Sequence, residues 1–204
     1  IPNPNAPSGA EKDLAELERI IAANPDVIVI IDEAYIDFGA QSAIGLIPKY
    51  ENLLVVQTFS KSRSLAGMRI GYAFGSEKLI RYLNDAKYSF NSYTMNTVTI
   101  AMGVEAVKDD DYFQETIRKV VATREWTKEE LRRLGFVFQD SKSNFIFASH
   151  PKYPAKELFA ALKQQGIYVR YFEKPRIDNY LRISIGTDEE MQTLLSFLEQ
   201  YVGA

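Results

Sequence analysis

Val27-Ile28-Val29-Ile30-Ile31 is an unbroken β-branched run that leads directly into Asp32-Glu33-Ala34-Tyr35. Such a run is apolar on both faces, which is typical of a strand buried within a parallel sheet. Leu53 to Gln57 repeats the pattern and leads into Thr58-Phe59-Ser60-Lys61. Because apolar residues recur at helical spacing over Glu11 to Ala23, we predict an α/β fold with a mainly parallel sheet.

The second half of the chain has a different character. Asp111 to Leu134 is long, charged and helically periodic, and Gly135, a residue typical of helix ends, follows it. Around this segment we expect strands over 69–75, 136–139, 144–149, 167–172 and 180–185 and helices over 77–87, 96–108, 155–165 and 187–201, with Thr187 or Asp188 near the last N-cap. The pattern predicts three parts: residues 1–110 belong to a large domain, 111–135 form a linking helix, and 136–204 form a small α+β domain with a half-solvated sheet.

Composition narrows the class of protein. Hydrophobic residues make up 46% of the 204 residues, which is enough for a sizeable core. The formal net charge of −3 argues against a nucleic-acid partner, and no apolar run is long enough to span a membrane. The absence of cysteine excludes disulfides and thiolate metal sites and fits a reducing compartment, and no metal site is expected. The chain opens on Ile1-Pro2-Asn3-Pro4, which reads like the middle of a longer protein.

Polar residues that could carry chemistry fall into four short motifs. In chain order they are Asn3-Pro4-Asn5-Ala6-Pro7-Ser8-Gly9, Asp32-Glu33-Ala34-Tyr35, Thr58-Phe59-Ser60-Lys61 and Ala66-Gly67-Met68-Arg69-Ile70-Gly71. Ligands of parallel α/β sheets bind beyond the carboxyl ends of the strands, and Asp32 and Lys61 are both expected at such ends. A lone lysine after a strand is usually a solvated surface residue, so the case for a site depends on the four motifs together.

These residue types meet the needs of an aldehyde cofactor with a pyridine ring and a phosphate. Lys61 supplies an amine for a Schiff base, and Asp32 supplies a carboxylate that keeps the ring nitrogen protonated. Tyr35 can hydrogen-bond the ring hydroxyl and so lower the pKa of the Schiff base. Three side chains can hold the phosphate, the last as a planar fork of donors: Thr58, Ser60 and Arg69.

The four motifs resemble those of the fold-type-I aminotransferases, and specifically the histidinol-phosphate aminotransferases. The resemblance covers the whole chain and implies pyridoxal 5'-phosphate as the cofactor and a cytoplasmic homodimer as the full-length protein. It implies transfer of an amino group between L-histidinol phosphate and a 2-oxo acid, 2-oxoglutarate, in histidine biosynthesis. It also implies that Arg182, within Leu181-Arg182-Ile183-Ser184-Ile185-Gly186, binds the substrate α-carboxylate. Arg170 falls where the family has an arginine for the substrate phosphate, with Arg176 as a nearby competitor.

Two departures from the family pattern bear on this expectation. The family's asparagine for the ring hydroxyl is the second of an Asn-Asn-Pro, and here that position is Ala6, so either Asn5 takes over or Tyr35 acts alone. Full-length relatives also begin upstream, with a glycine-rich segment that caps the phosphate and a tyrosine lent by the neighbouring subunit. The alternatives are an aromatic amino-acid aminotransferase, a phospho-amino-acid decarboxylase of the same fold, or an inactive fragment that only associates with its missing half or with itself.

Overall fold

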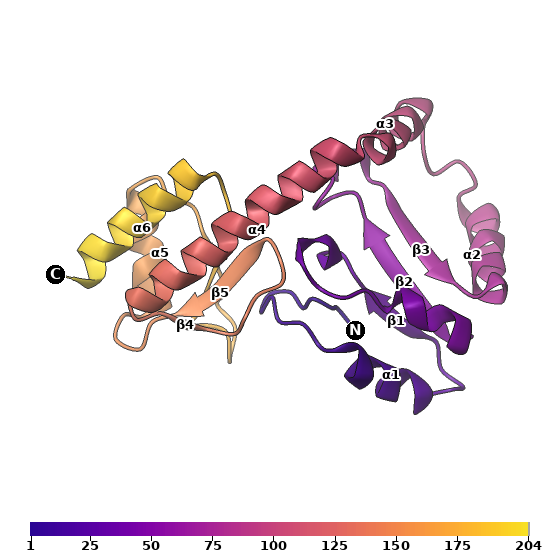
Figure 1. Cartoon of the computed structure of the whole chain (residues 1–204), viewed down its shortest axis with the longest axis horizontal. Coiled ribbons are helices and arrows are strands. Elements are labelled where there is room, and N and C mark those ends of the chain that lie inside the picture. Colours follow the sequence, from indigo (N-terminus) through magenta and orange to yellow (C-terminus); the bar gives the residue numbers. More distant parts are fainter. Residues whose placement is uncertain (204) are drawn as a thin grey trace. The chain divides into compact units, whose positions relative to one another are not determined.

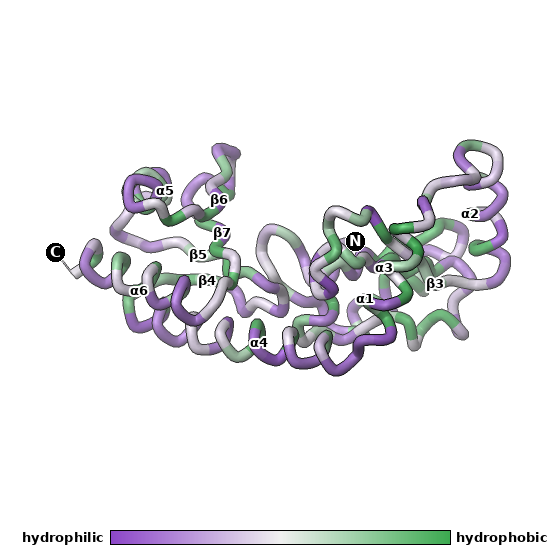
Figure 2. The backbone as a smooth tube through the Cα atoms, turned by 90° about the horizontal axis from the view of Figure 1, so that it is seen from above, coloured by the Kyte–Doolittle hydropathy of each residue, from purple (hydrophilic) through white to green (hydrophobic). Residues whose placement is uncertain are grey.

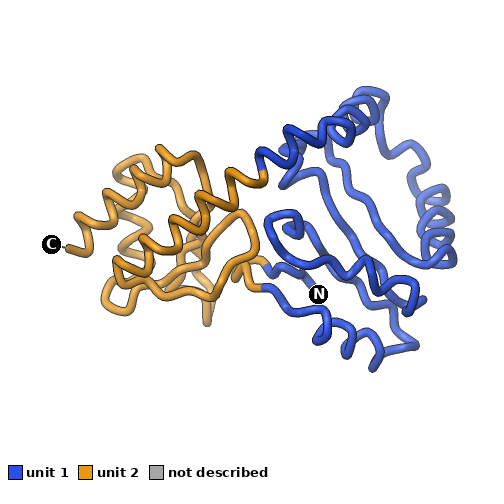
Figure 3. The backbone as a smooth tube through the Cα atoms, in the orientation of Figure 1, with its two compact units in different colours: residues 1–5, 11–116 blue, residues 6–10, 117–204 orange. Residues whose placement is uncertain are grey.

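The computed structural model describes residues 1–203, which form two compact units (Figure 3). Unit 1 comprises residues 1–5 and 11–116, and unit 2 comprises residues 6–10 and those from 117 onward. Each unit has its own sheet. Helices accompany both sheets, so the fold class is α/β, as the sequence predicts.

Unit 1 is built on a three-stranded sheet in the order β1-β2-β3 (Figure 1). β1 (Val29–Asp32) and β2 (Leu53–Thr58) are parallel, as expected. β3 (Gly71–Gly75) is antiparallel to β2, with Gly71 opposite Thr58, so the sheet is mixed and the mainly parallel expectation is wrong at this strand. The connection, residues 59–70, contains no α-helix and only the 3₁₀ turn η3 (Ala66–Met68), whereas the crossover between two parallel strands is usually an α-helix.

One face of this sheet is covered by α1 (Leu14–Ala22) and by the 3₁₀ helix η2 (Ala43–Lys49). α1 begins after Asp13, whose carboxylate accepts the N–H of Glu16 at 2.7 Å, as an N-cap does. The core on this face contains, among others, Leu17, Ile21, Ile31, Leu53 and Val55. The remaining helices of unit 1 are η1 (Ile36–Phe38), α2 (Glu77–Phe90) and α3 (Thr97–Lys108).

The opposite face of β1 is not buried, contrary to the expectation of a strand buried on both faces. Ile28 is 55% and Ile30 is 46% exposed, whereas Ile31 is fully buried. α3 shows the same excess of exposed apolar side chains: it is apolar along most of its length (Figure 2), and Val98 and Val104 are exposed. Among residues 1–203, nothing packs closely enough on these side chains to bury them.

Unit 2 holds a four-stranded antiparallel sheet in the order β4-β5-β7-β6. The strands are β4 (Val137–Phe138), β5 (Phe145–Ser149), β6 (Arg170–Tyr171) and β7 (Leu181–Ser184). The core of the unit joins the sheet to the end of α4 (Asp110–Arg133), to α5 (Ala155–Gln164) and to α6 (Asp188–Val202). α4 is one helix of 24 residues that begins in unit 1 and ends in unit 2.

Local sequence signals explain several boundaries in unit 2. Gly135 has φ +85°, a backbone conformation that suits glycine after a helix end. Thr187 is the N-cap of α6 and forms a capping box with Glu190, which confirms the expected start of that helix. The half-solvated sheet is correct for β7, where Leu181 and Ile183 are buried and Ser184 is exposed. It is wrong for β5, whose five side chains are all buried.

Residues 6–10 form part of unit 2 although their neighbours on both sides belong to unit 1. The carbonyl of Gly9 accepts the N–H of Lys142 at 2.9 Å. Gly9 has φ +75°, and a Cβ there would lie 2.3 Å from Ser141 Oγ, so only glycine fits. Of the helices within residues 1–203, none has both the length and the apolar character needed to cross a membrane.

Candidate cofactor and substrate sites

Asp32 is the last residue of β1, and its carboxylate is exposed. Its backbone is paired with the start of the chain: Asp32 N–H donates to the carbonyl of Ile1, and Asn3 N–H donates to the carbonyl of Asp32, both at 2.8 Å. One carboxylate oxygen accepts the N–H of Ala34 at 3.0 Å. The side chain is thus fixed at the strand end while it remains accessible to a ligand.

Glu33, the next residue, has a different role that the sequence argument missed. It is 1% exposed, and its carboxylate accepts hydrogen bonds from Ser42 Oγ at 2.7 Å, Ala43 N at 2.6 Å and Gln57 Nε2 at 2.8 Å. Successive residues of a strand face opposite sides of the sheet, and this alternation is the signal that separates the two acids. Glu33 therefore ties β1 to β2 and η2, whereas Asp32 stays open.

Lys61 lies in the loop of residues 59–70, three residues after β2 ends. Its ammonium Nζ lies 5.2 Å from the centre of the Tyr35 ring. The side chain is exposed and, within residues 1–203, forms no ion pair with a carboxylate. Lys61 and Tyr35 follow the carboxyl ends of adjacent parallel strands, so the sheet brings these two candidates together.

Thr58, Ser60 and Arg69 occupy the two ends of the same loop. Thr58 Oγ1 donates to Ser60 Oγ at 3.0 Å and accepts the N–H of Ser60 at 3.1 Å. The pairing of Thr58 with Gly71 brings Arg69 back toward the end of β2. Arg69 precedes β3 with φ 57° and donates to the carbonyl of Ala66 at 2.9 Å, without a carboxylate partner in the described chain. One loop thus offers two hydroxyls and a guanidinium to an anion.

The motif at the start of the chain is only partly available for a ligand. Asn3 is 1% exposed, and its side chain is occupied by both backbone groups of Lys12, at 2.7 and 3.1 Å. Asn5 is partly buried and interacts within the chain.

The other candidate groups of unit 1, described above, are an amine, a carboxylate, a phenol, two hydroxyls and a guanidinium. This set of groups fits an aldehyde cofactor with a ring nitrogen and a phosphate.

In unit 2, Arg170 of β6 and Arg182 of β7 are direct cross-strand partners. The Arg182 guanidinium lies 5.0 Å from the Phe145 ring centre and 5.8 Å from that of Phe172, and the Arg170 guanidinium lies 5.4 Å from the same Phe172 ring. The Nε of Arg182 is buried and has no hydrogen-bond partner within residues 1–203. Like charges opposite one another destabilise a sheet, and a buried donor without a partner costs free energy. Both features are typical of a site that binds an anion.

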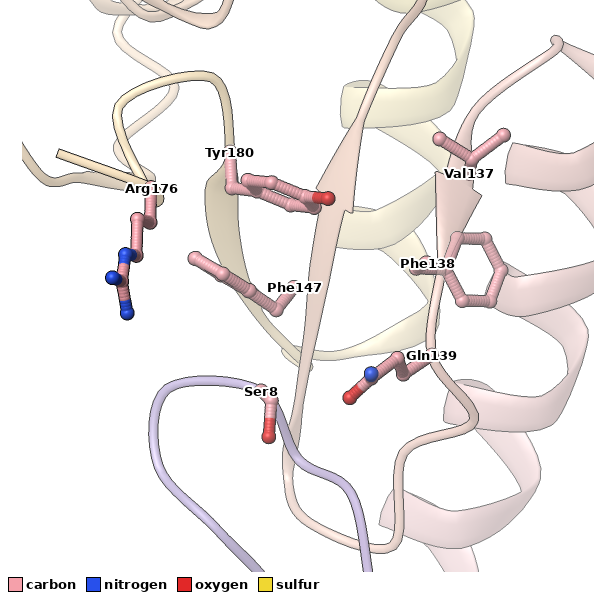
Figure 4. A pocket seen from close by; sticks show the side chains of 7 residues that line it. All are labelled: Ser8, Val137, Phe138, Gln139, Phe147, Arg176 and Tyr180. Atoms are coloured by element: carbon pink, nitrogen blue, oxygen red, sulfur yellow. The ribbon is translucent and has the colours of Figure 1, made fainter.

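Arg176 is the third arginine considered for the substrate phosphate. It has φ 74° and lines a cavity of about 420 Å³ within unit 2 (Figure 4). Phe147 and Tyr180 form one wall of the cavity, with their rings stacked at 4.7 Å. The structure thus pairs Arg170 with Arg182 by register, while Arg176 lines a cavity beside Phe147, which is itself the cross-strand partner of Arg182.

Comparisons with known proteins agree with this chemistry. The family described as aminotransferase class I and II matches residues 1–198. Histidinol-phosphate aminotransferases of Brachyspira hyodysenteriae and Marinomonas sp. are 57% and 53% identical to the chain over 99% and 98% of its length. The chain spans 57% of the length of each of these relatives.

A solved structure gives the same result at the level of the fold. The histidinol-phosphate aminotransferase of Sinorhizobium meliloti, in complex with pyridoxal-5'-phosphate, superposes with a TM-score of 0.84 at 25% identity. That match covers 100% of this chain and 56% of the other. The family match extends over nearly all of the residues that form both units. The chain therefore belongs to the class I and II aminotransferase family.

Proposed function

We propose that the whole protein is a pyridoxal-phosphate-dependent aminotransferase that exchanges an amino group between L-histidinol phosphate and 2-oxoglutarate. The observation that carries the proposal is the position of the Lys61 amine. It lies over the Tyr35 ring, beyond the end of β2, and β2 pairs with β1, the strand that ends at Asp32. Similarity to relatives that are named histidinol-phosphate aminotransferases supports the choice of substrate.

In this proposal unit 1 holds the cofactor. Lys61 attaches it covalently, Asp32 pairs with its ring nitrogen, and Tyr35 donates a hydrogen bond to its ring hydroxyl. Its phosphate is held by Thr58, Ser60 and Arg69. Asn5 is a further candidate for the ring hydroxyl because Ala6 stands where the family has asparagine. When bound, pyridoxal phosphate supplies an aldehyde that takes up the amine and a ring that takes up electron density.

The chain's own groups then carry out the proton chemistry. The Asp32 carboxylate keeps a proton on the ring nitrogen, because a charge-assisted hydrogen bond favours the protonated form. The amine of Lys61 would take up and hold the proton that leaves the substrate carbon bearing the amine, acting first as a base and, when it gives the proton back, as an acid. Its exposed position, with no ion-pair partner among residues 1–203, fits this role.

Unit 2 supplies the substrate anion site. The phosphorylated substrate carries a phosphate and no carboxylate, whereas the amino acid carries carboxylates, so one site must accept both anions. Arg170 and Arg182, as cross-strand partners, offer two planar donor forks for this purpose. We assign the α-carboxylate to Arg182, whose buried Nε has no partner in the described part of the chain, and the phosphate to Arg170.

Similarity to the same relatives supports the proposed domains, compartment and oligomeric state. Residues 1–110 would form part of the cofactor domain, 111–135 the linking helix and 136–204 the small domain, in a cytoplasmic homodimer. A phospho-amino-acid decarboxylase or an aromatic amino-acid aminotransferase is less favoured, since relatives at 53–57% identity are named histidinol-phosphate aminotransferases.

The test is product analysis. Protein loaded with pyridoxal phosphate is incubated with L-histidinol phosphate and 2-oxoglutarate, and glutamate is measured against a Lys61→Ala variant prepared in the same way. We expect glutamate from the wild type only. Release of carbon dioxide from a phosphorylated amino acid would identify a decarboxylase instead. A faster reaction with an aromatic amino acid than with L-histidinol phosphate would identify an aromatic amino-acid aminotransferase.

A further inference from the structure

The loop that carries Lys61 has little regular structure of its own. It contains the three-residue turn η3 and backbone hydrogen bonds such as Ser64 N–H to the Lys61 carbonyl at 3.0 Å. Lys61 itself has no carboxylate partner among residues 1–203. Its 5.2 Å approach to the Tyr35 ring must therefore depend on how the neighbouring residues of the loop are anchored.

Ser62, the residue after Lys61, provides one anchor. It is 5% exposed, and its hydroxyl donates to a carboxylate oxygen of Asp37. Asp37 lies in η1, two residues after Tyr35. A single hydrogen bond thus joins the segment that carries the lysine to the segment that carries the tyrosine, although 25 residues separate its two partners.

Arg63 provides a second anchor. Its guanidinium stacks 3.8 Å from the ring centre of Phe113, in the first turns of α4, and lies 5.6 Å from that of Phe59. It also donates to the carbonyl of Ala106 in α3 at 2.6 Å. A planar guanidinium can stack and hydrogen-bond at once, which a lysine ammonium cannot reproduce. Arg63 therefore attaches the loop to α3 and to the first turns of α4, in addition to the bond between Ser62 and the segment that carries Tyr35.

We propose that Ser62 and Arg63 are positioning residues that hold the amine of Lys61 over Tyr35. Neither touches the reacting atoms, and both act through the placement of the loop between β2 and β3. The proposal rests on the proposed function, in which Tyr35 lowers the pKa of the lysine–cofactor linkage. If either anchor is lost, Lys61 moves away from Tyr35 and that lowering diminishes.

The experiment uses the whole protein loaded with pyridoxal phosphate. The readout is the pH midpoint of the cofactor's absorbance change, recorded for wild type, Ser62→Ala, Asp37→Asn and Arg63→Lys. Ser64→Asn serves as the matched control, because Ser64 is an exposed residue of the same loop and asparagine tolerates its positive φ of 55°. We expect the three anchor variants to raise the midpoint by about 0.5 to 1 pH unit and the control to leave it unchanged.

The same measurements in a Tyr35→Phe protein distinguish a positioning role of the anchors from an effect on stability alone. There the anchor substitutions should no longer move the midpoint, since the hydrogen bond that they disturb is already absent. Anchor variants that unfold at lower temperature yet keep the wild-type midpoint would overturn the proposal. Asp37→Asn preserves side-chain shape and decides the question if Ser62→Ala does not fold. If borohydride reduction of the wild type leaves Lys61 unlabelled, the proposed function itself is refuted.

Discussion

At the scale of single residues, the clearest consequence concerns Lys61. Reduction of the loaded protein with borohydride, followed by peptide mapping, should place the pyridoxyl group on Lys61. The reason is the position of its exposed amine over Tyr35, beyond the carboxyl end of β2. Recovery of the label on Lys78 or any other lysine would contradict the assignment.

Asp32 and Glu33 form a matched pair of neighbouring acids with different expected losses. Asp32→Asn should reduce kcat by about 100- to 1,000-fold with little change in stability, because a neutral amide no longer stabilises the protonated ring. Glu33→Gln should instead lower the free energy of unfolding by about 1–3 kcal/mol, since a buried carboxylate with three donors is disturbed. Turnover assays and urea unfolding on both variants check this, and a reversed pattern would exchange the two roles.

The two cross-strand arginines should separate the two substrates. Arg170→Ala should cost about 2–4 kcal/mol in kcat/KM with L-histidinol phosphate and little with glutamate, because the lost contact is to phosphate. Arg133→Ala is the control, since Arg133 is an exposed arginine of the same unit that pairs with Glu130 and Glu199. Equal losses with both substrates, or none, would remove Arg170 from the phosphate site and favour an aromatic amino-acid substrate.

At the scale of elements, α4 places the nearly buried side chain of Lys128 in unit 2. The side chain of Lys128 is 3% exposed and pairs with Glu125 at 2.6 Å and with Asp140. Partial burial is the largest single influence and acts to raise the pKa of each carboxyl. The hydrogen bond from Lys128 and the charges of the neighbouring cations, Arg124 among them, together outweigh burial and leave both pKa values lowered. This cluster therefore makes the stability of unit 2 depend on pH.

The sign follows from the direction of those pKa shifts. A carboxyl with a lowered folded pKa stabilises the fold above its unfolded value, here 4.5 for Glu125 and 3.8 for Asp140, and this contribution is lost as the pH falls through the folded value. Because both groups are partly exposed, Asp140→Asn should remove only about 0.5–1 kcal/mol at pH 7, and less near pH 3. Fluorescence of Trp126, the single tryptophan, reports the unfolding, with Asp178→Asn as control.

Individual elements also show what sequence reasoning could and could not reach. Strand and helix positions followed from local periodicity, as did the N-cap Thr187 and the glycine at residue 135, because these depend on neighbouring residues alone. The direction of β3 and the exposure of Ile30 did not, because both depend on what packs against a strand. The Ser62–Asp37 bond was equally out of reach, since no local pattern links residues 25 apart.

For the candidate site, the residue types were accessible and the pairings were not. Lys61, Asp32 and Tyr35 stand at strand ends that the apolar runs define, so their neighbourhood could be expected. The separate structural role of Glu33 and the direct register of Arg170 with Arg182 appear only once the strands are paired. Sequence thus suggested which groups matter, and tertiary structure shows which of them meet.

At the scale of the whole molecule, the exposed apolar side chains of unit 1 should govern behaviour in solution. We expect the 204-residue chain by itself to self-associate and to bind pyridoxal phosphate weakly, because Ile28, Ile30 and the outer side of α3 expose apolar surface. Size-exclusion chromatography at several concentrations tests this. Val98→Glu combined with Val104→Lys should shift the chain toward monomer, and a monodisperse wild-type monomer would refute the expectation.

The assignment of residues 6–10 to unit 2 has a consequence for how the gene could be divided. The chain passes between the units at residues 5/6, 10/11 and 116/117, so no single break in the coding sequence yields two self-contained products. A product that begins at residue 117 would lack Gly9, whose carbonyl accepts the Lys142 N–H. Recombination that exchanges unit 2 between relatives must therefore carry along residues 6–10 as well, which makes the two units a poor pair of interchangeable modules.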